Sequence, residues 1–173
     1  MPSPMYFHPF QDHQHWIGIG PQGLLSPPSS VSLHWVSPTF GKAHYKYLWK
    51  MGNNSNTFQN YVANTDRIYV MGHCSPGSLF LETETGTQDT CYDWELARIF
   101  ERHGLQKASQ VHIRIHACDS GGNGSFAQSF KQMMVNRGYN NVTVRGYTTG
   151  VGIYLFYRWA GFFQPANNFA VDY

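Results

Sequence analysis

Between residues 67 and 147 the chain alternates short apolar segments with longer amphipathic ones, and this alternation limits the folds open to it. Segment 67–71 reads RIYVM, 111–115 reads VHIRI and 142–147 reads VTVRGY, and each has the β-branched and apolar content of a strand. Helical patterns fill both intervals. The order strand–helix–strand–helix–strand predicts right-handed crossovers and a mostly parallel α/β sheet flanked by helices.

The two expected helices have recognisable ends. The first runs over residues 93–103, and Asp89-Thr90 before it offers an N-cap. The second begins after Ser125, which caps it, and ends at Gly138. Both place apolar side chains on a single face, so each is expected to pack against the sheet.

Outside this core the pattern is weaker. Residues 1–30 are expected to be irregular, 31–36 to form a strand and 41–51 a short helix. The aromatic tail at 150–173 either walls a substrate groove or covers a sheet edge. At 173 residues, the chain 1–173 is expected to form one domain with a sizeable core.

Composition excludes several classes of protein. Tyr 11, Phe 12 and Trp 5 favour a packed globule over disorder. A net charge of +2 with 13% charged residues argues against a nucleic-acid partner, and no apolar stretch is long enough to span a membrane. Three cysteines without a CxxC argue against a disulfide framework. With no signal-peptide pattern at the start, we expect a cytoplasmic protein or one delivered into a target cell.

His73 and Cys118 each follow one of the apolar segments. Two parallel strands end at the same edge of a sheet, where open α/β folds place their ligands. A thiol becomes a reactive thiolate beside a base, and histidine is the usual base. All nine histidines lie at or before His116, so a nucleophile at Cys118 must use a histidine that precedes it. The sequence therefore predicts a His73–Cys118 catalytic dyad.

The residues around the dyad have expected roles as well. The Cys118 N–H and a donor from the turn after His73 are expected to hold an oxyanion. The oxyanion and turn positions are Gly72, Cys74, Gly77 and Gly121. His116 and Asp119 are possible accessory groups. Strand alternation puts His116 on the same sheet face as Cys118, where it would line the site. Asp119 would orient His73, bind a basic substrate side chain or shape its own turn.

An apolar strand ending in Gly72-His73, a helix, and an apolar strand ending in Ala117-Cys118-Asp119-Ser120-Gly121 resembles the caspase-like cysteine peptidases. That group includes caspases, clostripain, gingipains, separase and toxin self-processing domains. The resemblance covers about residues 67–147. It implies a three-layer caspase-like architecture and a cysteine peptidase, with a bacterial effector or a toxin-associated domain as the kind of protein that would carry it. The group has His-Gly, whereas this chain has Cys74 after His73.

Three alternatives stay open. Cys91 lies at the start of the first expected helix, with His112 and His116 after it, which is papain-like order. Cys74, His73, His116 and Cys118 are adequate zinc ligands, although their spacing is not typical of a zinc site. In the third alternative, the domain is a catalytically inactive caspase-like module for binding or adhesion.

We expect a protein or peptide substrate and neither a cofactor nor a metal. Asp119 is the only carboxylate adjacent to the predicted nucleophile, Arg145 and Arg158 are the basic candidates, and aromatic residues are many in 147–163. This favours an apolar or small residue before the cut. The sequence gives no indication of oligomeric state.

Overall fold

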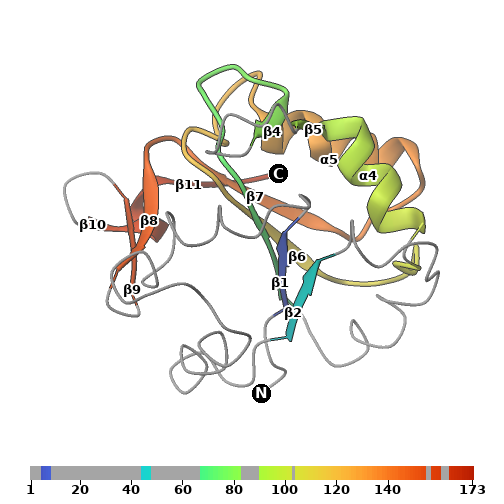
Figure 1. The fold of residues 1–173 in the computed structure, drawn as a ribbon. Helices are drawn as coiled ribbons and strands as arrows, with labels where there is room; N and C mark the ends of the chain where they lie inside the picture. The colour runs from blue at the N-terminus through green and yellow to red at the C-terminus, as the bar shows by residue number, and fades with distance from the viewer. Residues whose placement is uncertain are drawn as a thin grey trace.

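The computed structural model describes residues 5–8, 44–47, 67–82, 90–102, 104–154, 157–160 and 164–173. Six strands form one sheet in the order β11-β7-β6-β3-β1-β2 (Figure 1). Every neighbouring pair is parallel except β11 with β7. The strands are β1 Met5–His8, β2 His44–Tyr47, β3 Arg67–Met71, β6 His112–His116, β7 Thr143–Tyr147 and β11 Ala170–Asp172.

Two helices, α4 (Asp93–Arg102) and α5 (Phe126–Asn136), pack beside each other on one face of this sheet (Figure 1). Phe100 of α4 and Phe130 of α5 meet edge to face, with ring centroids 5.8 Å apart. Fully buried side chains of the central strands complete this core: Ile68, Val70, Ile113, Ile115 and Val144. The predicted α/β class, with a mostly parallel sheet and helices packed against it, is confirmed.

The two helices begin differently. The Ser125 hydroxyl accepts the Gln128 N–H at 3.4 Å, so the predicted cap of α5 is confirmed. The predicted cap of α4 at Thr90 is wrong, because Thr90 belongs to a strand. At α4 the Glu95 carboxylate instead accepts the Tyr92 N–H at 2.9 Å, which is half of a capping box.

Two expectations for the N-terminal third also fail. Residues 44–47 form β2, not part of a helix over 41–51, and residues 5–8 of the segment expected to be irregular form β1. The two strands pair with each other in parallel, and β1 also pairs with β3. β1 and β2 are strands because they pair with segments far away in the sequence, and local sequence patterns do not reveal such pairing. The strand expected at 31–36 lies outside the described residues.

The remaining strands form two small sheets. β4 (Phe80–Glu82) and β5 (Thr90–Tyr92) pair in antiparallel fashion after His73. β8, β9 and β10 form the other sheet: Val151–Tyr154, Tyr157–Ala160 and Gln164–Pro165. A 3-10 helix at Ala166–Phe169 leads into β11, so the last part of the aromatic tail covers the edge of β7.

Candidate active site

The two predicted dyad residues each come two residues after the end of one of two neighbouring strands. β3 and β6 are adjacent and parallel, and Met71 pairs with His116 at the carboxyl end of the ladder. His73 lies two residues beyond Met71, and Cys118 lies two residues beyond His116. The topology therefore brings both residues to the same edge of the sheet.

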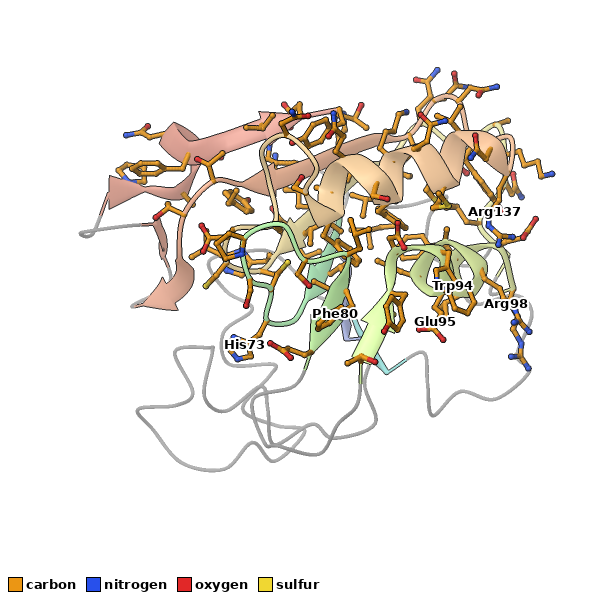
Figure 2. All side chains as sticks on the ribbon, turned by 90° about the horizontal axis from the view of Figure 1, so that it is seen from above. His73, Phe80, Trp94, Glu95, Arg98 and Arg137 are labelled. Carbon is orange, nitrogen blue, oxygen red and sulfur yellow. The ribbon has the colours of Figure 1, made fainter. Side chains whose placement is uncertain are left out.

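His73 is held by its backbone. Its N–H donates to the Glu82 carbonyl and its own carbonyl accepts the Glu82 N–H, both at 2.9 Å. The following residues form the expected turn, in which the Ser78 N–H donates to Ser75 at 3.0 Å and Gly77 has a φ of +74°. Figure 2 shows His73 on the side of the β4–β5 pair where β4 lies, and far from Trp94 of α4. His73 is partly exposed.

Cys118 begins a tight turn with an unusual backbone. Asp119 is the only described non-glycine residue with a positive φ, at +51°. Its N–H donates to the Thr149 carbonyl at 3.2 Å, which ties the turn to the segment after β7. An aspartate tolerates this left-handed conformation better than most residues. Cys118 itself remains partly exposed.

Ser120 fixes the other side of this turn and is fully buried. Its hydroxyl lies 2.8 Å from the Ala117 carbonyl and 3.0 Å from the Ile115 carbonyl. It also accepts the Tyr147 N–H at 3.2 Å. One side chain thus links the end of β6, the Cys118 turn and the end of β7.

The chain crosses β7 closely just after Ser120. A Cβ on Gly121 would lie 2.7 Å from the Tyr147 nitrogen, and one on Gly146 would lie 2.6 Å from the Ser120 carbonyl oxygen. Real Cβ atoms do not approach other atoms so closely, so both positions require glycine. The predicted turn role of Gly121 therefore has a steric basis.

The Cys118 sulfur contacts the backbone at the start of β8. Sγ accepts the Val151 N–H at 3.4 Å and lies 3.7 Å from the Val151 carbonyl, to which the thiol donates. Gly150, which is exposed, precedes this contact, and a Cβ there would be 3.8 Å from Sγ. The thiol therefore has a backbone donor on one side and a residue without a side chain next to it.

Cys74 occupies the position after His73 but is a different kind of thiol. It is buried, and burial, followed by the nearby negative charge of Asp119, raises its pKa to about 12. A smaller electrostatic contribution from Cys118 raises the pKa of Cys74 further, so the two residues are close enough to interact electrostatically. Its thiol lies 3.5 Å from the Ser75 carbonyl. Cys74 therefore stays protonated at neutral pH.

Cys91 is not at a helix start as predicted. It lies in β5, is 2% exposed, and pairs with Leu81. Burial raises the pKa of its thiol, and the charges of Glu95 and Asp93 raise it further. The papain-like interpretation placed Cys91 in the first turn of the helix, whereas the residue lies in a strand, two residues before α4 begins, and its buried thiol has a raised pKa and not a lowered one.

His116 is buried at 1% exposure and packs edge-on against the Tyr147 ring, with centroids 5.8 Å apart. Gly72 is buried beside the dyad. Within the described part of the chain, no three His, Cys, Asp or Glu side chains form a group that could hold a metal ion. The set of Cys74, His116 and Cys118 thus does not form a zinc site there.

Sequence reasoning missed the contributions of Val151 and Tyr173. The Tyr173 hydroxyl accepts the Gly122 N–H at 2.7 Å and donates to the Gly122 carbonyl at 2.6 Å. No sequence motif marks either residue. The signal available for Val151 was only its position after the Thr-Thr-Gly turn that follows β7.

Of the two arginines named as basic candidates, Arg145 lies in β7. Arg145 is paired with Asp172 through two contacts of 2.6 Å and so fastens β11 to β7. The side chain of Arg158 lies outside the described residues. Arg145 is therefore already committed to a structural ion pair.

No protein-family model matches the chain, and no curated protein matches it. Among the helices that the structure describes, none has the length and apolar character needed to cross a membrane.

Proposed function

We propose that this chain is a cysteine peptidase in which His73 and Cys118 form the dyad. One observation carries the proposal: both residues follow adjacent parallel strands at the same offset from the paired residues Met71 and His116. The resemblance of the sequence to caspase-like peptidases also favours it, and a three-layer caspase-like architecture is part of the same proposal. Cys118 is also the only one of the three thiols that is not buried.

The chemistry assigned to the dyad is acyl transfer. His73 takes the thiol proton, and the Cys118 thiolate attacks the carbonyl carbon of a peptide bond. The imidazolium then gives this proton to the leaving amine as the carbon–nitrogen bond breaks. Water hydrolyses the resulting thioester with His73 as the base, which restores the free enzyme.

Three single substitutions test the assignment. We expect Cys118→Ala and His73→Ala to abolish cleavage of a peptide library and Cys91→Ala to retain it. Activity lost in Cys91→Ala but kept in Cys118→Ala would reverse the assignment. Circular dichroism and urea unfolding of each variant separate a lost catalytic group from a lost fold.

The substrate and setting belong to the same proposal. We propose cleavage after an apolar or small residue, because Asp119 is the only carboxylate beside Cys118 in the sequence and Arg145 is already paired. Three free thiols suit a reducing compartment, such as the cytosol of the producing cell or of a target cell. A strong preference for Lys or Arg before the cut would contradict the apolar choice.

A second candidate function is a protein-binding module, and a specific surface favours it. Leu79, Tyr92 and Trp94 are the exposed large hydrophobic residues of the described part, each between 42% and 45% exposed. Tyr92 stacks on Trp94 and contacts the ring of Phe80. Such a patch is typical of interaction sites. Fast iodoacetamide labelling of Cys118 alone favours the peptidase, whereas three slow thiols favour the binding module.

A further inference from the structure

The turn between β7 and β8 supplies groups to the Cys118 site that the dyad does not include. Its residues 148–150 pass beside the nucleophile turn, and the Thr149 carbonyl accepts the Asp119 N–H at 3.2 Å. The next residue, Val151, directs its N–H at Sγ of Cys118 from 3.4 Å. The position of this donor is thus fixed by a second hydrogen bond two residues earlier.

This donor lies where the chemistry needs one. When a thiolate attacks a carbonyl, negative charge moves from the sulfur to the carbonyl oxygen, which is bonded to the same carbon as the sulfur. A donor already in contact with Sγ is therefore within reach of that oxygen.

We propose that the Val151 N–H is a catalytic group that stabilises the Cys118 thiolate and then the oxyanion. This inference rests on the proposed dyad. As the sulfur–carbon bond forms, the π electrons of the carbonyl move to its oxygen, and the N–H groups of Val151 and Cys118 donate hydrogen bonds to the resulting oxyanion. When the carbonyl re-forms, the carbon–nitrogen bond breaks and the amine takes its proton from His73.

The neighbouring residue keeps this region open to a substrate. Gly150 is exposed, and even an added Cβ would only reach ordinary van der Waals contact with Sγ, at 3.8 Å. A carbonyl group can therefore approach the sulfur past Gly150 without meeting a side chain of that residue. The donor and the approach path come from the same turn.

A backbone substitution tests the proposal without changing any side chain. The peptide bond before Val151 is replaced by an ester, which removes the N–H and also makes the Gly150 carbonyl a weaker acceptor. The matched control is an ester before Thr148, whose N–H donates to the Phe169 carbonyl at 3.0 Å in the same turn and not to the thiol. Both proteins are assayed for kcat and KM, for Cys118 alkylation by iodoacetamide and for urea unfolding.

We expect the Val151 ester to lower kcat about 100-fold with little change in KM, as expected for the loss of one oxyanion donor. It should also slow alkylation of Cys118, whereas the Thr148 ester should leave kcat and alkylation unchanged. Wild-type values for the Val151 ester would overturn the inference and leave the dyad intact. If the natural protein cleaves no peptide, alkylation decides alone: a slower rate supports the donor, and an equal rate refutes it.

Discussion

At the scale of single residues, the hydroxyl of Tyr173 is the clearest link between the last strand and the loop after Cys118. It bonds to both the N–H and the carbonyl of Gly122 and lies 3.3 Å from the Ser125 hydroxyl, the cap of α5. Gly122 has a φ of +102°, so this loop has a conformation that few other residues adopt. The hydroxyl therefore holds the loop in place.

Removing this hydroxyl should loosen the loop. We expect Tyr173→Phe to destabilise the protein by about 1–2 kcal/mol, because the Gly122 N–H loses its acceptor. Hydrogen exchange of the Gly122 amide should become faster. Tyr139→Phe is the matched control, since its hydroxyl donates to the buried Leu105 carbonyl at 3.0 Å. The control should lose similar stability without changing exchange at Gly122, and equal exchange in both variants would contradict the assigned role.

The sequence predicted, for physical reasons, where some residues of the candidate site lie in the fold. A nucleophile at Cys118 needs an earlier histidine, and the strand pattern placed His73 at the matching strand end. The sequence could not reveal Val151, because a backbone N–H belongs to every residue and only the three-dimensional path aims it at Sγ. Cys91 was misplaced for a related reason: burial in a strand pair with β4 overrode the nearby helix signal.

At the scale of elements, the contact between the Cys118 turn and β7 sets the position of Cys118. Gly121 and Gly146 let the two backbones approach, and the Ser120 carbonyl accepts the Ala127 N–H of α5 at 2.9 Å. A strand, a turn and a helix thus meet at one point. Packing this close leaves no space for a methyl group.

Gly146→Ala should therefore be costly. Its new Cβ would lie 2.6 Å from the Ser120 carbonyl oxygen and 2.7 Å from the Ala127 Cβ. We expect a loss of about 3 kcal/mol in the free energy of unfolding, at the upper end for an overpacked core, measured by urea denaturation. Gly150→Ala, which has only a 3.8 Å contact, serves as the control and should change stability by less than about 1 kcal/mol. Similar losses in both variants would contradict the steric explanation.

The elements differ in how well the sequence predicted them. β3, β6, β7 and α5 have apolar patterns or caps that agree with their tertiary environment, and all four were predicted. β1 and β2 each have four residues with mixed polar and aromatic character. Such short segments fit either a helix or a strand, and pairing with a distant partner decides between them.

At the scale of the whole molecule, the fold divides its three thiols into two kinds. Cys74 and Cys91 are buried, which raises the pKa of each, while Cys118 is partly exposed. The burial of Cys91 depends on the packing of the β4–β5 hairpin against α4 and the sheet, since all contribute to one hydrophobic core. Of the three thiols, Cys91 should therefore show the largest change in pKa when the whole protein unfolds.

This dependence predicts a loss of stability in alkaline solution. Below pH 9.0, the ordinary thiol pKa, Cys91 is protonated in both the folded and the unfolded chain, and its contribution is complete. Above pH 9.0 the unfolded chain releases the proton while the folded chain keeps it, so stability falls as pH rises. Between pH 8 and pH 10.5, one buried thiol of this kind lowers the free energy of unfolding by about 2 kcal/mol.

Cys91→Ala should remove that part of the pH dependence. Urea unfolding at pH 8 and pH 10.5 would show a difference about 2 kcal/mol smaller than in the natural protein, whatever stability the variant loses at pH 8 through the cavity. Leu96→Ala is the control, because it also opens a cavity in the same core but carries no titrating group. Relative to the natural protein, Leu96→Ala should lose the same free energy of unfolding at pH 8 and at pH 10.5. Its own stability should therefore fall between the two pH values by as much as that of the natural protein. If Cys91→Ala keeps the full dependence as well, the thiol is accessible to water in the native state, and the buried hairpin described here does not persist in solution.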